Sequence, residues 1–291
     1  MKRGVELAAA CAVAMMGFSM ISSERKMTTS LLEDALTQQK IELACTGLGG
    51  HSGKSVELTI KNNSGAPLQL RVPQGTLFEA SNSSEQNLVV PETELISLAK
   101  GEKKKYKVSG FCTELHDMSP DKGSGFSLSR TNDSVLVKLV NYITRHPGLP
   151  TGAIQEAIWC VTNGSNVSNI CNETPAKVKE LREFVCSLTA KKDVWYDTPR
   201  ERIVTPERLI SNVPTIVTGM LEFEATEIMK VKSEIRDSLG KVITANPETM
   251  TFPKGKFHFD FKVTVKGWEK GKYTVIYYTE TKTLIKQEFE I

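Results

Sequence analysis

The chain has 291 residues, the length of about two domains at roughly 150 residues each. Its 37 basic and 34 acidic residues give a formal net charge of +3. This near balance lacks the clustered basic excess of nucleic-acid-binding proteins, so we expect no nucleic-acid partner. Apolar residues make up 40% of the chain, which permits a packed core of ordinary size.

The N-terminus is typical of an export signal. Lys2 and Arg3 form a positively charged start, and an apolar stretch at residues 7–21 leads to the small residues Ser22 and Ser23. This stretch is shorter than the roughly 20 apolar residues of a transmembrane helix. We therefore predict a signal peptide at residues 1–23, with a retained membrane anchor as the alternative. Residues 24–40 are expected to form a tether or a short helix.

From residue 41 to about 111, the pattern predicts short strands joined by turns. Apolar and polar residues alternate at Val56, Leu58 and Ile60, and again along residues 68–72 and 106–111. Turn-forming residues such as those at 62–65 and 101–103 separate these runs. Short strands with regular turns indicate an antiparallel β-sandwich.

The apolar spacing then changes to that of helices. A first helix is expected between a cap at Asp133 or Ser134 and the stop at Pro147. A second is expected after residues 151–152 and before Asn163, and a third from Pro175. Each of the three has one apolar face that can pack on a sheet. The three helices complete a first domain at residues 41–190.

The rest of the chain returns to strands. Residues 191–212 are polar, contain Pro199 and Pro206, and are expected to form a linker. Residues 213–291 hold about six or seven short strands, which is the size of an immunoglobulin-like sandwich. We therefore predict a mostly β fold: a β-sandwich plus three short helices, then a second, immunoglobulin-like β-sandwich.

Three stretches resemble known families. The sequence FCTE at residues 111–114, followed by QEAIWCVTN at residues 155–163, resembles a group of uncharacterised exported proteins of Gram-negative bacteria. This resemblance covers residues 56–163 and implies export and a mixed sandwich-and-helix domain. More remotely, the aromatic-Cys pair and the apolar-Gln-x-x-apolar-apolar helix resemble the thioester domain of surface adhesins from Gram-positive bacteria. Residues 270–275 resemble the immunoglobulin-like add-on domains of exported bacterial proteins.

The resemblance to thioester domains implies a specific pair, Cys112 and Gln155. In those domains the two side chains condense into an internal thioester that captures a host amine. Such a bond needs near-attack geometry and apolar surroundings that exclude water, and Trp159 is the expected shield. This chain departs from the pattern because Thr113 and Glu114 follow the cysteine where apolar residues are usual. The alternative is that Gln155 makes ordinary hydrogen bonds and Cys112 is a small buried residue.

Export also affects how the other cysteines are interpreted. Once Cys11 leaves with the signal, five cysteines remain, and a bridge between Cys171 and either Cys160 or Cys186 would tie the helices together. The chain has no Cys-x-x-Cys and its four histidines are scattered, so we expect no metal and no cofactor.

Cys112 and His116 also form a candidate nucleophile and base, but no third orienting residue is evident. We therefore predict an exported protein, in the periplasm, on the outer cell surface or outside the cell. Its expected role is structural, adhesive or binding, toward a protein or a glycan, without enzymatic activity. Membrane contact is expected only through an N-terminal anchor. A covalent adhesin with a Cys112–Gln155 thioester is the first alternative, and a cysteine-dependent enzyme is the second.

Overall fold

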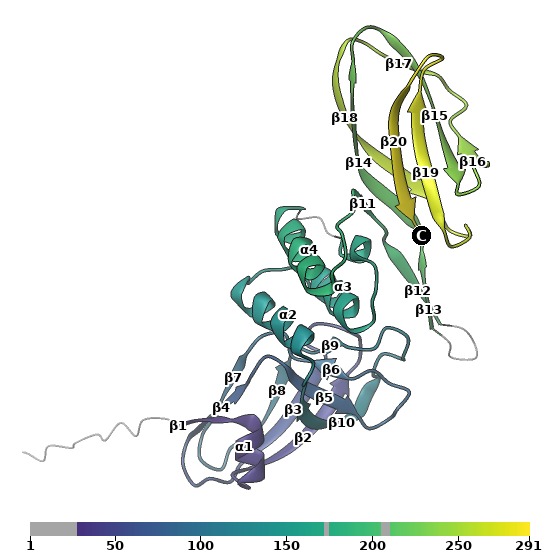
Figure 1. Ribbon diagram of the computed structural model, residues 1–291. Helices are drawn as coiled ribbons and strands as arrows, with labels where there is room; N and C mark the ends of the chain where they lie inside the picture. Colours follow the sequence, from purple (N-terminus) through teal and green to yellow (C-terminus); the bar gives the residue numbers. More distant parts are fainter. Residues whose placement is uncertain (1–27, 172–174, 205–209) are drawn as a thin grey trace, which may run out of the picture.

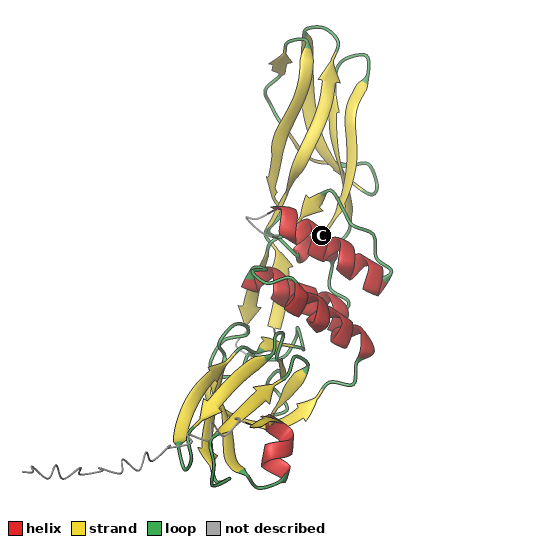
Figure 2. Ribbon diagram, turned by 90° about the vertical axis from the view of Figure 1, so that its left-hand side faces the viewer, coloured by secondary structure: helices red, strands yellow, loops and turns green. Residues whose placement is uncertain are grey.

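The computed structural model describes residues 28–171, 175–204 and 210–291. The fold is mostly β, as predicted, with two groups of strands at opposite ends and three helices between them (Figure 1, Figure 2). The signal peptide predicted at residues 1–23 lies outside the described residues. So does the first part of the segment that we expected to be a tether or a short helix.

The described part of that segment is folded onto the first sandwich. Strand β1 (Thr28–Leu31) pairs in parallel with β4 (Leu68–Val72), and helix α1 (Leu32–Thr37) follows it directly. Leu32 and Ala35 on α1 are fully buried, which explains why the helix packs against the sheet. The short helix is therefore confirmed, whereas sequence analysis missed β1.

The first sandwich has two sheets. A three-stranded sheet has the order β1-β4-β7, and a seven-stranded sheet has the order β8-β3-β2-β10-β5-β6-β9. Along β3, every second residue is buried, because alternate side chains of a strand point to the same face. The strands not yet delimited are β2 (Ile41–Leu48), β3 (Val56–Asn62), β5 (Thr76–Ala80), β6 (Leu88–Val89), β7 (Glu94–Leu98), β8 (Lys103–Val108), β9 (Phe111–Cys112) and β10 (Lys122–Arg130).

Three helices follow the sandwich: α2 (Ser134–Arg145), α3 (Thr151–Thr162) and α4 (Pro175–Thr189). The Asp133 side chain accepts hydrogen bonds from two main-chain N–H groups of the first turn of α2, which confirms the predicted cap. A short 3-10 helix, η1 (Val167–Asn169), joins α3 to α4. The apolar faces of the helices form a second core, which also contains Phe111 of β9.

The second sandwich has its own core, rich in aromatic residues. One sheet has the order β11-β14-β18 and the facing sheet has the order β16-β15-β19-β20, with β17 also paired to β15. Strands β12 and β13 form a separate hairpin. The bounds are β11 (Tyr196–Asp197), β12 (Arg200–Val204), β13 (Ile210–Pro214), β14 (Ile216–Ala225), β15 (Met229–Asp237), β16 (Val242–Ala245), β17 (Met250–Phe252), β18 (Gly255–Thr264), β19 (Lys272–Tyr278) and β20 (Thr283–Glu290).

The segment 191–212, which we expected to be a linker, contains β11, β12 and the start of β13. Its two aromatic residues pack on the second sandwich. Trp195 donates its indole N–H to the carbonyl of Glu288 at 2.7 Å, and the Tyr196 hydroxyl accepts from the N–H of Glu290 at 2.9 Å. Gly219 on β14 makes room for the indole: a Cβ there would lie 2.7 Å from a ring carbon of Trp195.

Candidate functional site

The predicted pair lies where α3 packs against strand β9. Gln155, Trp159 and Thr162 have the spacing i, i+4, i+7, which places all three on one face of α3. That face meets β9, the last strand of the seven-stranded sheet. Helix α3 therefore covers a sheet edge that water or another strand would otherwise reach.

The amide of Gln155 binds both main-chain groups of Cys112. Gln155 Nε2 donates to the carbonyl of Cys112 at 2.8 Å, and the Cys112 N–H donates to Gln155 Oε1 at 3.1 Å. The Cys112 N–H also lies 3.0 Å from the carbonyl of His51. The opposite edge of β9 pairs with β6, where Cys112 faces Leu88. Gln155 thus occupies the place that a neighbouring strand would take, and it brings together two residues 43 positions apart.

Both members of the pair are buried, with exposures of 2% for Gln155 and 0% for Cys112. The two residues of β9 belong to different cores: Cys112 belongs to the sandwich core, and Phe111 belongs to the helical core. Trp159 belongs to the same sandwich core as Cys112 and stacks on His51 with a centroid distance of 5.9 Å. Its indole N–H is buried without a hydrogen-bond partner among the described residues. Trp159 therefore contributes its apolar surface to the surroundings of Cys112.

The end of α3 holds the residues that follow Cys112. The Thr162 hydroxyl donates to the carbonyl of Thr113 at 2.8 Å, and the Asn163 amide donates to the same carbonyl at 2.6 Å. The Asn163 carbonyl oxygen accepts from the N–H of Leu115 at 3.0 Å. Sequence analysis used Asn163 only as a helix stop. The i, i+7 spacing of Gln155 and Thr162 was the sequence signal that could have placed Thr162 on the face of α3 that meets β9.

Glu114 fixes the same segment from the side of the sandwich. Its carboxylate accepts from the main-chain N–H of Asn87 at 2.7 Å, from the Asn87 amide at 2.9 Å, and from the Thr113 hydroxyl at 2.8 Å. This contact gives a structural reason for the acidic residue that departs from the thioester-domain pattern. The FCTE stretch is therefore held by hydrogen bonds from two directions.

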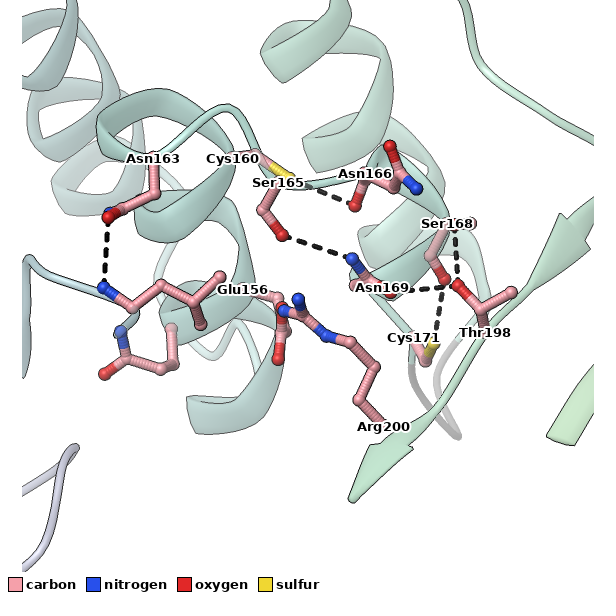
Figure 3. Close-up of polar contacts among 12 residues, drawn as sticks. Glu156, Cys160, Asn163, Ser165, Asn166, Ser168, Asn169, Cys171, Thr198 and Arg200 are labelled. Atoms are coloured by element: carbon pink, nitrogen blue, oxygen red, sulfur yellow. Dashed lines mark hydrogen bonds and ion pairs between the residues drawn. The ribbon is translucent and has the colours of Figure 1, made fainter. Parts of the chain in front are cut away.

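A second polar cluster joins α3 to the start of the second sandwich (Figure 3). Glu156 forms an ion pair with Arg200 of β12, and their side chains are only 21% and 11% exposed. Burial raises the pKa of Glu156, while the positive charge of Arg200 and its hydrogen bond act in the opposite direction. Glu156 is one residue after Gln155, about 100° further round the helix. One turn of α3 therefore contacts both β9 and the β12–β13 hairpin.

Hydroxyl and amide groups extend this cluster around η1. The hydroxyls of Ser168 and Thr198 lie 2.7 Å apart, and Thr198 also donates to the Asn169 carbonyl oxygen at 2.9 Å. The Asn169 amide donates to the hydroxyl of Ser165 at 3.1 Å. Three of these residues are less than 8% exposed: Ser168, Asn169 and Thr198. The connection between β11 and β12 is thus bonded to the helical layer.

The disulfide that we expected between Cys171 and either Cys160 or Cys186 is absent, and none of the described cysteines forms a bridge. Two of these thiols instead donate to separate main-chain carbonyls (Figure 3). Cys160 Sγ lies 3.3 Å from the oxygen of Asn166, and Cys171 Sγ lies 3.1 Å from the oxygen of Ser168. Burial raises the pKa of both thiols to about 12, so they remain protonated donors at neutral pH.

The cleft beside this cluster has a volume of about 470 Å³ and opens between the α3–η1 loop and the second sandwich. Polar side chains line both sides, with Asn163, Asn166 and Arg200 on one side and Lys270 and Glu290 on the other, next to the apolar residues Leu115, Pro214 and Ile291. His116 also lines it and is exposed, whereas Cys112 four residues earlier is fully buried. The two residues of the candidate nucleophile and base therefore stand in different environments.

Across the described ranges, no three His, Cys, Asp or Glu side chains gather as a metal site would require. None of the helices described is long and apolar enough to cross a membrane. No protein-family profile, curated protein or solved structure matches the chain.

Proposed function

We propose that the protein is an exported binding or adhesive protein that holds a polar ligand, most suitably a glycan, in the cleft between its two sandwiches. The cleft carries this proposal. Amide and hydroxyl groups are suited to hydrogen-bond sugar hydroxyls, and Lys270 is suited to an acidic sugar.

Polar contacts between the helices and residues 193–200, which include Arg200 of the cleft wall, support a fixed geometry for such a ligand. Arg182 of α4 bonds Asp193 and Asp197 at 2.8 and 2.5 Å, and Arg200 binds Glu156. Arg182 is 8% exposed and the two carboxylates are each 35% exposed, so the guanidinium is held in place from the buried side of these bonds. A binding site built between two rigid bodies needs such bonds, because a loose junction would add an ordering cost on binding.

A glycan array of neutral and acidic sugars, probed with the mature chain, tests this function. Lys270→Glu and Asn166→Ala each replace an exposed residue of the cleft wall. We expect either change to weaken binding to the sugars that the wild-type protein binds on the array. Lys282→Glu, at the distant turn after β19, makes the same charge change outside the cleft and should leave binding intact. Equal loss from Lys270→Glu and Lys282→Glu would overturn the proposed site.

We infer a second candidate function, a covalent adhesin, from the contact between Gln155 and Cys112. In the proposed reaction, the Cys112 sulfur attacks the amide carbon of Gln155, a sulfur–carbon bond forms, the carbon–nitrogen bond breaks, and ammonia leaves with the thiol proton. The supporting observation is that the amide binds the main chain of the cysteine in a buried, apolar surround.

Intact-mass measurement of the mature protein tests this second function. The wild type is expected to lack one ammonia, and Cys112→Ala and Gln155→Glu should each have the mass calculated from their sequences. Methylamine should restore a stable amide at residue 155 in the wild type only. A wild-type mass equal to that of the unmodified chain refutes the covalent mechanism and leaves the cleft proposal standing.

A further inference from the structure

Strand β18 forms the open edge of the second sandwich. It pairs with β14 over ten residue pairs, from Gly255 opposite Ala225 to Thr264 opposite Ile216. It is the last strand in the order β11-β14-β18, and no strand among the described residues pairs with its other side. A long edge with unpaired N–H and C=O groups is a surface on which another strand can add.

A groove of about 200 Å³ lies along this edge. Four consecutive residues of β18, 260–263, line it, and successive residues of a strand point to opposite faces. The main chain of β18 is therefore accessible in the groove. The other wall comes from the facing sheet, including β16, whose four residues are all exposed. Val242 and Ile243 of β16 are 45% and 37% exposed, so both edges on this side present apolar surface.

The core is also incompletely covered on this side. On β14, the inward residues Leu221 and Phe223 are 2% and 9% exposed. Their partners on β18, Phe259 and Phe257, point to the same face of the sheet but are only half-buried. Val263 is likewise half-buried. A further strand beside β18 would cover these side chains.

We propose that β18 pairs in antiparallel register with β18 of a second copy, with Phe261 on the two-fold axis. In this register Asp260 lies opposite Lys262 of the second copy, and Lys262 lies opposite its Asp260. On the inner face, Phe259 lies opposite Val263 of the second copy, twice by symmetry. The interface thus contains two opposite-charge pairs and two apolar pairs, which are the contacts that stabilise neighbouring strands.

The charges and the position of the groove together favour this register over those centred on Asp260, Lys262 or His258. Centring the pair on Asp260 would set two aspartates opposite each other, and centring it on Lys262 would set two lysines opposite each other. Centring it on His258 pairs Asp260 with Lys256, but it moves the contact away from the accessible main chain at residues 260–263. Because the contact is isologous, it uses up the edge in both copies and stops at a dimer.

Charge reversal separates this contact from the stability of the fold. Asp260 and Lys262 are exposed, and their partners on β14 are the uncharged Met220 and Thr218. Reversing either charge therefore removes no ion pair within one copy. We expect Asp260→Lys and Lys262→Asp each to weaken dimerisation by roughly ten- to a hundred-fold, since each change turns two attractive pairs into repulsive ones.

Sedimentation equilibrium of the mature chain over a range of concentrations tests the proposal, which is independent of the ligand and of the thioester. The double variant Asp260→Lys/Lys262→Asp restores both pairs and should recover the wild-type dimer. Lys230→Asp, an exposed reversal opposite Thr251 on the facing sheet, should leave the dimer unchanged. A monomer at every concentration, or a dimer that the double variant fails to restore, overturns it. Sensitivity to Asp260→Lys but not to Lys262→Asp assigns the register centred on His258 and overturns the one proposed.

Discussion

Replacing Gln155 with leucine tests whether this residue stabilises the first domain by completing the edge of β9. Leucine has a similar size but no hydrogen-bonding group. The N–H of Cys112 keeps the carbonyl of His51 at 3.0 Å, so the main loss is the amide donor 2.8 Å from the Cys112 carbonyl. Removing a donor from a buried acceptor costs about 1–3 kcal/mol. We expect the free energy of unfolding to fall by about 2 kcal/mol.

Thr162→Val is the matched control, because it removes a hydrogen bond from the same face of α3. The carbonyl of Thr113 that loses the hydroxyl keeps the Asn163 amide at 2.6 Å. We therefore expect a loss below about 1 kcal/mol. Urea unfolding followed by both circular dichroism and fluorescence measures the two changes and checks that one transition is observed. The reasoning is refuted if Thr162→Val lowers the free energy of unfolding as much as Gln155→Leu does. A second hydrogen-bond donor to the Thr113 carbonyl would then give no protection against loss of the first.

Three further changes test the junction and the cores. Arg200→Met leaves Glu156 buried without its cation and should cost about 2–3 kcal/mol near neutral pH. Burial raises the pKa of Glu156, so its protonated form favours folding and its ionised form opposes folding. The stability lost in Arg200→Met, measured by urea unfolding, should therefore grow from about pH 4 to about pH 7. The pKa of Cys160 is raised to about 12, so little of the reactive thiolate is present at about pH 8. Iodoacetamide should therefore label Cys160 at least about 100-fold more slowly in the folded chain than in the unfolded chain, as measured by peptide mapping. Gly219→Ala places a methyl group against the Trp195 indole, which should destabilise the fold by about 1–3 kcal/mol and lower the melting temperature. The control Gly152→Ala adds a methyl group in open space at the start of α3 and should be neutral or stabilising.

The helices were predictable because their signals are local. The cap at Asp133 and the stop at Pro147 delimit α2, which runs from Ser134 to Arg145. The second and third helices likewise have the positions that capping residues and apolar spacing predicted. The mostly β fold with two sandwiches followed from the same kind of evidence, the alternation of apolar residues between turns.

The polar contacts were less predictable because they join residues far apart in sequence. Nothing near Arg200 indicates that its guanidinium will reach Glu156, 44 positions earlier. The polar composition of residues 191–212 predicts a linker. Some of these polar side chains, such as Thr198 and Arg200, instead form buried hydrogen bonds or ion pairs with the helices. The thiols of Cys160 and Cys171 illustrate the same limit: cysteine spacing permits a bridge, but only the fold decides which atom each sulfur faces.

Helix α3 connects the parts of the molecule that the proposals treat separately. Gln155 and Trp159 contact β9 and the first core, Ile158 contributes to the helical core, and Glu156 binds Arg200 of the β12–β13 hairpin. Close-packed interiors transmit small displacements rather than absorb them. A bond between Gln155 and Cys112 would remove the amide nitrogen that binds the Cys112 carbonyl, and α3 would have to adjust. The adjustment would shift Glu156, one residue later, and its ion-pair partner Arg200, which lines the cleft, so formation of the thioester would change the walls of the cleft. Binding in the cleft and formation of the thioester are therefore expected to be coupled.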